Sequence, residues 1–179
     1  RTVSGSAPAS TALAIASADT GFAEYVFVHE FGHHFAALAD EYYTSDVAYE
    51  TGAADLPEPW EMNVTALKDP ATLKWKDLVA AATPLPTPWS KEAFEKTSRD
   101  FQARRKALLA AGAPPTAIDD LFREQQKVEA AFFAKEKFMG KVGAFEGAAY
   151  EPKGLYRSSA DCIMFTRTEA GFCPVCRRA

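Results

Sequence analysis

Three histidines, the full set in this chain of 179 residues, fall in the run His-Glu-Phe-Gly-His-His from His29 to His34. On a helix, His29 and His33 would lie about 40° apart around the axis and about 6 Å apart along it. Their rings could therefore converge on one metal ion, while Glu30, about 60° from His33, could reach a water on that ion. This His-Glu-x-x-His spacing is typical of zinc hydrolases that cleave peptide bonds.

The segment around these residues predicts the helix that the spacing requires. Residues 22–38 are mostly apolar, and an inward-facing stripe at helical spacing contains Phe22, Val26, His29 and His33. The two histidines thus continue an apolar face, where an unpaired polar group is costly to bury. A metal ion is therefore a better explanation than two ordinary core histidines. His34 points elsewhere, and we expect it to be a hydrogen-bonding or surface residue.

A catalytic zinc ion usually has three protein ligands and one open position, so a third ligand is needed. On a straight helix Asp40 would lie about 10.5 Å beyond His33, too far for a bond of about 2 Å. The chain must therefore bend at residues 36–39. Asp40 is the favoured ligand, Glu41 is the next candidate, and a distant carboxylate such as Glu146 is the third. Alternatively, Asp40 and Glu41 orient a histidine through its other ring nitrogen.

The remaining elements form the expected framework of a single domain, residues 1–179. Residues 11–16 could be a short strand ahead of the motif helix, and residues 41–70 resemble a long loop. Two helices, at about 91–111 and from 116 onward, predict an antiparallel hairpin within residues 90–139. Thr116 and Asp119 resemble a capping box at the start of the second helix. From residue 140 the chain is glycine-rich, and we expect irregular structure up to the C-terminal tail.

Composition limits the class of protein. Hydrophobic residues make up 47% and charged residues 25% of the chain, as in an ordinary soluble globular protein. The formal net charge of −4 gives no reason to expect binding to nucleic acid. No apolar run approaches the length of a membrane helix, so we expect no membrane insertion. The sequence does not indicate an oligomeric state.

The three cysteines are Cys162, Cys173 and Cys176, all close to the C-terminus. The Cys-x-x-Cys pair could be a redox pair, half of a zinc knuckle, or part of a disulfide to Cys162. A separate structural zinc site lacks ligands, because there is no second cysteine pair and no further histidine. We therefore favour a disulfide that holds the C-terminal segment in place. A disulfide would suit a secreted, periplasmic or cell-surface protein.

The motif run from His29 to His33, followed by Leu-Ala-Asp-Glu-Tyr at residues 38–42, resembles the IgA-peptidase family of bacterial zinc metallopeptidases, within the zincins. Shorter similar pieces continue to the C-terminus. They are Pro59-Trp60, Asn63-Val64-Thr65, Leu73-Lys74-Trp75-Lys76, Pro86-Thr87-Pro88-Trp89, Phe145-Glu146-Gly147-Ala148, Gly154-Leu155-Tyr156-Arg157, Cys162-Ile163-Met164 and Phe172-Cys173-Pro174-Val175-Cys176.

The resemblance implies an α+β fold. It is a zincin-like metalloprotease domain with an active-site helix, a small mixed sheet and a helical-hairpin insertion. The domain begins late relative to that pattern, so we expect the sheet to be truncated at its N-terminal side. The resemblance also implies that His29, His33 and Asp40 bind Zn²⁺. Met164 would lie in a turn beneath the metal, or would simply be a core residue. This chain has Ala36-Ala37 where a glycine often lets the chain turn.

The expected function is zinc-dependent hydrolysis of peptide bonds in a protein or peptide substrate. Glu30 would be the general base. Tyr42 and Tyr156 are candidates for the donor that stabilises the oxyanion. The alternative is an inactive zinc-binding or structural module, although zinc binding alone does not require Glu30. A third reading is a thiol-disulfide enzyme that uses Cys173 and Cys176.

Overall fold

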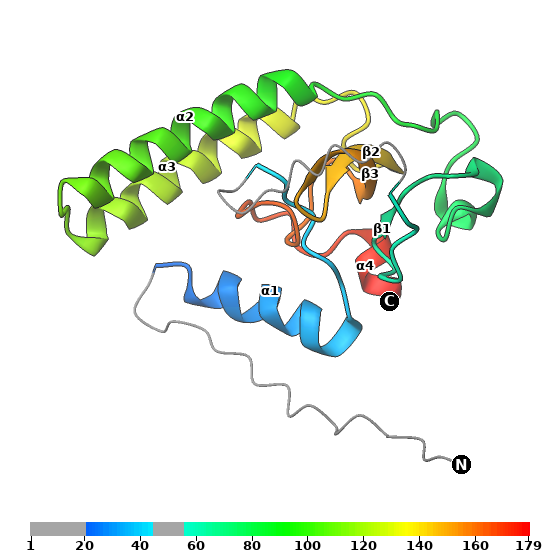
Figure 1. The fold of residues 1–179 in the computed structure, drawn as a ribbon, viewed down its shortest axis with the longest axis horizontal. Coiled ribbons are helices and arrows are strands. Elements are labelled where there is room, and N and C mark those ends of the chain that lie inside the picture. Colours follow the sequence, from blue (N-terminus) through cyan, green and yellow to red (C-terminus); the bar gives the residue numbers. More distant parts are fainter. Residues whose placement is uncertain (1–20, 45–55) are drawn as a thin grey trace, which may run out of the picture.

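A computed structural model describes residues 21–44 and 56–179 (Figure 1). Its elements in chain order are α1 (Ala23–Ala36), β1 (Val64–Thr65), two short 3-10 turns η1 (Pro70–Thr72) and η2 (Lys76–Leu78), α2 (Lys91–Ala110), α3 (Pro115–Phe133), β2 (Val142–Ala148), β3 (Glu151–Ser159) and α4 (Pro174–Arg178). Helices and a small separate sheet make the fold α+β, as predicted. The strand expected at residues 11–16 lies outside the described residues.

The sheet has three strands in the order β1-β3-β2, and both pairings are antiparallel. The prediction of a mixed sheet is therefore wrong for the part of the chain that the structure describes. The reason lies in the connection, because β2 and β3 are joined by only Ala149 and Tyr150. Both residues have positive φ, 49° and 66°, as a type I′ hairpin turn requires. A connection this short can join only antiparallel neighbours.

The region after residue 140 was expected to be irregular, and this prediction is also wrong, because it forms β2 and β3. Glycine usually weakens a strand, but it is tolerated where another group approaches the backbone closely. Gly147 has φ +101°, and a Cβ atom there would overlap the ring of Tyr43. A Cβ atom on Gly143 would overlap the side chain of Thr87. These glycines let neighbouring segments pack directly against β2.

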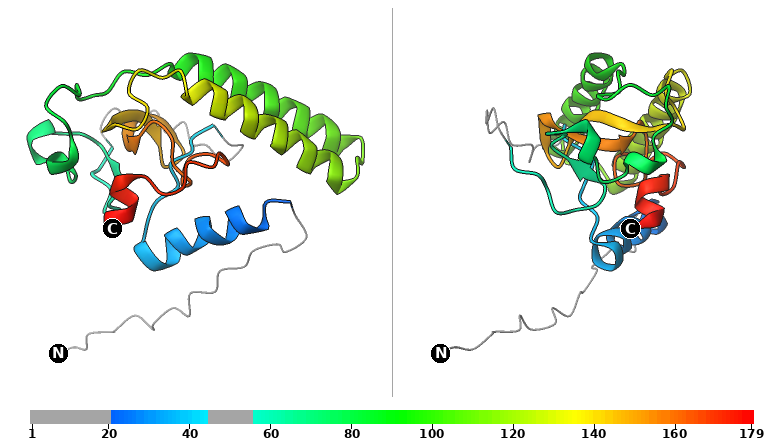
Figure 2. Two further views of the ribbon diagram at one scale, coloured as in Figure 1. Left: turned by 180° about the vertical axis from the view of Figure 1, so that it is seen from behind. Right: turned by 90° about the vertical axis from the view of Figure 1, so that its right-hand side faces the viewer.

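The predicted helical hairpin is present as α2 and α3, which lie side by side in both views of Figure 2. Arg104 on α2 forms two hydrogen bonds with Glu124 on α3, at 2.8 and 2.5 Å. The predicted capping box at Thr116 is wrong, because α3 begins at Pro115 with no side-chain cap. Proline suits the first position of a helix, where its missing N–H has no partner to lose.

The sheet and the C-terminal loops lie between part of α1 and the α2–α3 hairpin (Figure 1). Beyond this middle layer the two meet directly, because the ring centroids of Phe22 and Phe122 are 6.1 Å apart. The core of this layer includes Trp75, Phe145 and Met164, none of which is exposed. The buried Arg157 guanidinium lies 4.2 Å from the ring centroid of Trp89 and 3.8 Å from that of Phe165. No helix in the described ranges is long and apolar enough to cross a membrane.

Candidate metal centre

The motif helix ends in a tight turn that brings the chain back toward its own histidines. Helix α1 ends at Ala36, and Ala37 adopts the left-handed conformation with φ 50° and ψ 41°. The N–H groups of Ala37 and Leu38 both donate to the carbonyl of Gly32. This conformation costs a non-glycine residue about 1–2 kcal/mol, so the rest of the turn must hold it. The bend falls within residues 36–39, where the distance argument placed it.

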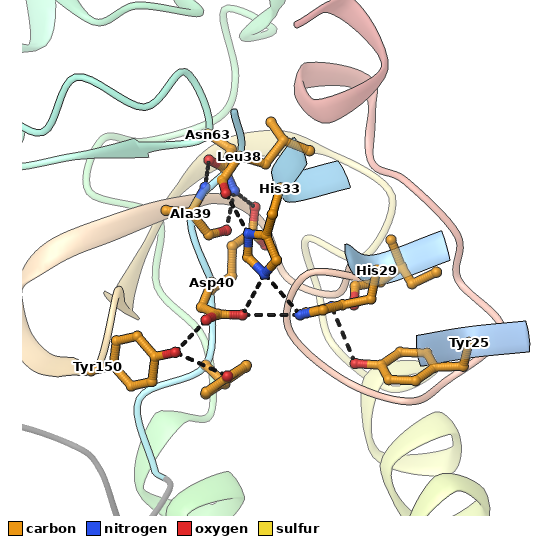
Figure 3. Close-up of polar contacts among 11 residues, drawn as sticks. Tyr25, His29, His33, Leu38, Ala39, Asp40, Asn63 and Tyr150 are labelled. Carbon is orange, nitrogen blue, oxygen red and sulfur yellow. Dashed lines mark hydrogen bonds and ion pairs between the residues drawn. The ribbon is translucent and has the colours of Figure 1, made fainter. Parts of the chain in front are cut away.

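Because of this turn, the Asp40 carboxylate meets both histidine rings (Figure 3). Asp40 Oδ1 lies 3.0 Å from His29 Nε2 and 3.2 Å from His33 Nε2. The two Nε2 atoms are 3.1 Å apart. The three atoms form a nearly equilateral triangle, and together they could hold a metal ion. Of the three candidates for a third ligand, Asp40 is the one that lies in this triangle.

The other ring nitrogens of the two histidines fix the direction of the Nε2 lone pairs. His29 Nδ1 is 3.0 Å from the carbonyl oxygen of Ile163, and His33 Nδ1 is 2.6 Å from that of Leu38. A carbonyl oxygen only accepts hydrogen bonds, so Nδ1 carries the hydrogen in the neutral ring. Both Nε2 atoms then present lone pairs to each other and to a carboxylate oxygen. With neutral rings these three acceptors repel one another, and either a proton on an Nε2 atom, which then donates to Asp40, or a metal ion between them removes the repulsion.

The protonation equilibria of the cluster follow from the same contacts. Burial alone would raise the pKa of the Asp40 carboxyl, but hydrogen bonds with His29, His33 and Tyr150 outweigh it and hold this pKa well below its ordinary value. The hydrogen bond with Asp40 raises the pKa of His33, although burial opposes it. Asp40 is therefore ionised at neutral pH, and a proton would compete with any metal ion for the nitrogen of His33.

Asp40 is oriented by a residue that the sequence did not point to. The hydroxyl of Tyr150 donates to Asp40 Oδ2 and lies 3.0 Å from the hydroxyl of Tyr42. The β2–β3 turn also bonds the backbone of the same segment, from Ala149 N to Asp40 O at 2.9 Å and from Tyr150 N to Tyr42 O at 3.0 Å. The hairpin turn thus fixes both the main chain and the side chain of Asp40.

Asn63 holds the loop from the other side. Its side chain accepts from Ala39 N and donates to Ala39 O, both at 2.9 Å. It also donates to Glu41 Oε1 at 3.0 Å. Asn63 is fully buried, so these bonds are shielded from water. Ala39, the residue directly before Asp40, is therefore fixed through both its N–H and its C=O by a buried amide, which the sequence had marked as part of the family resemblance.

Glu30 lies on α1 beside His29, and both residues line a cavity of about 350 Å³. The opposite wall belongs to the helical hairpin, with residues such as Phe94 on α2 and Phe122 on α3. Tyr42 contributes to the same lining, whereas His33 and Asp40 do not. The cavity therefore reaches the group formed by His29, His33 and Asp40 from the side of His29. It leaves Glu30 facing a space in which a substrate segment could lie.

The other candidate residues lie apart from this cluster. Glu41 is fully buried next to Cys176, and Glu146 forms an ion pair with Lys91 at 2.9 Å. Tyr156 lies on β3 opposite Thr65 and Glu146. Within the described ranges no polar contact links Tyr156 to the histidines. His34 is exposed, as expected.

Met164 lies in a turn directly beneath α1. Its sulfur would be 2.9 Å from a Cβ atom placed on Gly32, between the two histidines. The residue before it, Ile163, supplies the carbonyl that meets His29, and the carbonyl of Met164 accepts from Glu41 N at 2.8 Å. Met164 is thus a fully buried core residue that also belongs to the turn supporting the two histidines.

The expected disulfide is absent, because Cys162, Cys173 and Cys176 are free thiols. The sulfur atoms of Cys162 and Cys176 are 3.7 Å apart, whereas an S–S bond is about 2.05 Å long. All three side chains are buried, which also argues against a thiol-disulfide enzyme, since a reactive cysteine must be accessible.

Comparison with known proteins gives one clear result. Residues 4–179 match the family described as IgA Peptidase M64. No curated protein matches the chain. The matched range contains the motif helix, the Asp40 turn, the β2–β3 hairpin and the three cysteines, so it includes every residue of the cluster described above.

Proposed function

The chain belongs to the IgA peptidase M64 family, and from this premise we propose that it is a zinc-dependent endopeptidase with Glu30 as its general base. Family membership makes it a peptidase, as the sequence resemblance predicted. The zincin-type site, the identity of the metal and the role of Glu30 are the further steps of the proposal. One observation carries them, namely the convergence of His29, His33 and Asp40 beside Glu30 on the same helix.

The geometry of the triangle supports zinc. A tetrahedral zinc ion with bonds of about 2.0 Å has ligand–ligand edges of about 3.3 Å. The edges among the three ligand atoms here are 3.0, 3.1 and 3.2 Å. Two imidazoles and one carboxylate are also a ligand set that catalytic zinc sites use, with the fourth position left open. A Ca²⁺ or Mg²⁺ ion would instead prefer oxygen ligands and more of them.

In this site the protein's own groups would divide the work of hydrolysis. Bound zinc would supply a Lewis acid that polarises the peptide carbonyl and acidifies a water molecule. Glu30 would take the proton of the attacking water and pass it to the leaving amine. Ile163 and Leu38, through their carbonyls, keep the histidine rings aimed, and Tyr150 keeps Asp40 in place.

A donor for the oxyanion remains part of the proposal. Tyr42 lines the cavity beside Glu30, and burial raises the pKa of its hydroxyl above the ordinary value, so it keeps its proton. Tyr42 therefore fits this role better than Tyr156, which lies on β3 away from the cavity lining. The substrate would be a segment of protein or peptide lying between α1 and the helical hairpin.

Glu30→Gln tests the proposal. We expect this variant to retain its zinc while its cleavage of casein falls by about 10²–10⁴-fold, the usual contribution of a general base. Glu24→Gln, an exposed change on the same helix, should leave both properties unchanged. Full activity of Glu30→Gln with zinc bound would show that the base is another group. Zinc in the wild-type chain without any cleavage would support the inactive module instead.

A further inference from the structure

A second group of metal-ligating side chains lies in the core, apart from the histidine site. We call it the thiol cluster, and its members are Glu41, Cys162, Cys173 and Cys176. We propose that the thiol cluster binds a structural zinc ion, which fastens the C-terminal tail to the loop that carries Asp40. The ligand atoms all lie within 4.8 Å of one another, and all four residues are buried.

Two of the distances between ligand atoms match those of one tetrahedral zinc ion. With Zn–S bonds of about 2.3 Å, two sulfur ligands of a tetrahedral ion are about 3.8 Å apart. The Sγ atoms of Cys162 and Cys176 are 3.7 Å apart. With a Zn–O bond of about 2.0 Å, a sulfur and an oxygen ligand are about 3.5 Å apart. Cys176 Sγ lies 3.5 Å from Glu41 Oε1.

The sulfur atoms also receive hydrogen bonds that suit thiolates. Cys176 N donates to Cys173 Sγ at 3.5 Å, and Cys173 N donates to Cys162 Sγ at 3.4 Å. The Ser158 hydroxyl lies 3.2 Å from Cys173 Sγ. Donors directed at a sulfur stabilise its anionic form, which is the form that binds metal. The backbone around the Cys-x-x-Cys turn is therefore already arranged as in a zinc knuckle.

Glu41 gives an independent sign of a missing partner. It is fully buried, and Oε2, the carboxylate oxygen that does not contact Cys176, has no hydrogen-bond partner among residues 21–44 and 56–179. A buried carboxylate oxygen without a partner is costly unless a cation lies beside it. Arg157, also fully buried, interacts electrostatically with Glu41 and Cys162. When all four groups are ionised, as metal binding requires, the single positive charge of Arg157 cannot balance their four negative charges, whereas a divalent cation added to it leaves a net charge of only −1.

The proposed site is structural because it is closed. Four protein ligands fill a tetrahedral ion and leave no position for water or substrate. The ion would connect Glu41 to Cys176, which is 135 positions further along the chain. A link of this length restricts the unfolded chain strongly, and metal binding energy then adds directly to folding stability. Glu41 would thus stabilise the fold as a ligand of the structural ion, while its neighbour Asp40 would be a ligand at the histidine site.

The decisive experiment separates the two sites in the full chain. The variant His29→Ala/His33→Ala, purified without added reductant, should hold one zinc ion, against two in the wild type. Replacing that ion with Co²⁺ should give a thiolate-to-cobalt charge-transfer absorption. Three free thiols should titrate after denaturation in chelator. A double variant without zinc, without that absorption, or with a single titratable thiol would overturn the proposal.

Variants of the thiol cluster make the complementary test. Cys176→Ser and Glu41→Gln in the His29→Ala/His33→Ala background should lose the remaining zinc or bind it at least tenfold more weakly. Glu129→Gln, another buried carboxylate neutralised in the same way, should keep it with unchanged affinity. Retention of zinc by Cys176→Ser with wild-type affinity would exclude this cluster as its site. Because every measurement here is made without the histidine site, the result does not depend on the proposed peptidase function.

Discussion

Asp40 and Glu41 are consecutive in the chain, yet their carboxylates join two different clusters. Asp40 meets His29 and His33, while Glu41 meets Cys176. The backbone explains the divergence, because Asp40 O accepts from Ala149 N on one side and Glu41 N donates to Met164 O on the other. The segment thus behaves like a strand, in which successive side chains point in opposite directions. A single peptide unit joins the histidine site to the core.

Asp40→Asn should weaken zinc binding at the histidine site by more than about 100-fold, because loss of a ligand exceeds the 10–100-fold effect of a supporting residue. Competition with a chromogenic chelator measures the affinity. Glu146→Gln is the matched control and should leave the affinity unchanged, since the carboxylate of Glu146 pairs with Lys91. If Glu146→Gln lost zinc affinity while Asp40→Asn kept it, the third ligand would be Glu146.

Tyr150→Phe should lower zinc affinity by about 10–100-fold, the usual effect of losing a group that orients a ligand. The change removes the hydroxyl that donates to Asp40 Oδ2. At saturating zinc the variant should recover its kcat/KM, because Tyr150 acts through Asp40. Tyr156→Phe should change neither quantity. A kcat that stays low with zinc bound would instead make Tyr150 a direct participant in catalysis.

Gly147→Ala should destabilise the fold by about 3–5 kcal/mol, which combines backbone strain at φ +101° with overlap of the Tyr43 ring. Gly112→Ala carries similar strain, at φ +65°, but its Cβ would meet no atom within 4 Å. It should cost only about 1–2 kcal/mol. Urea unfolding at fixed zinc measures both. Equal losses would mean that Tyr43 moves aside freely.

Glu129 should make stability depend on pH. Burial raises the pKa of its carboxyl to about 7 from 4.5. Between pH 4.5 and 7 the folded chain keeps a proton that the unfolded chain has lost, so stability falls as the pH rises through this window, by about 3 kcal/mol. Glu129→Gln should remove that fall. The difference between variant and wild type, from urea unfolding at each pH, should grow from near zero at pH 4.5 to its full value above pH 7. A constant difference would contradict the assignment.

The parts of the site that the sequence predicted are those governed by local spacing. His29 and His33 share a helix face because four positions complete about one turn, and the hairpin follows from the helical spacing in α2 and α3. The family resemblance is confirmed by the match over residues 4–179. The need for a bend before Asp40 followed from distance alone. That Ala37 makes this bend was not predictable, because the left-handed conformation favours glycine.

What the sequence did not predict depends on contacts between distant segments. The roles of Tyr150 and Asn63 exist only once the hairpin turn and the β1 region pack against the motif loop. The thiol cluster was missed because ligands were sought only among cysteines and histidines, whereas the fourth group is Glu41. The strands β2 and β3 were missed because their glycines look like breakers until the side chains packed against them are known.

The three residues of the histidine site and the groups that orient them have very different places in the chain. Asp40 is only 11 positions from His29, but the carbonyl that orients His29 is 134 positions away, and Tyr150 is 110 positions beyond Asp40. During synthesis His29, His33 and Asp40 are therefore translated long before Tyr150 and Ile163, which orient them. We expect a chain truncated before residue 150 to bind zinc more weakly, because it lacks the groups that orient Asp40 and His29. We therefore expect the proposed peptidase activity to appear only after translation has passed residue 163, when the carbonyl that orients His29 is present.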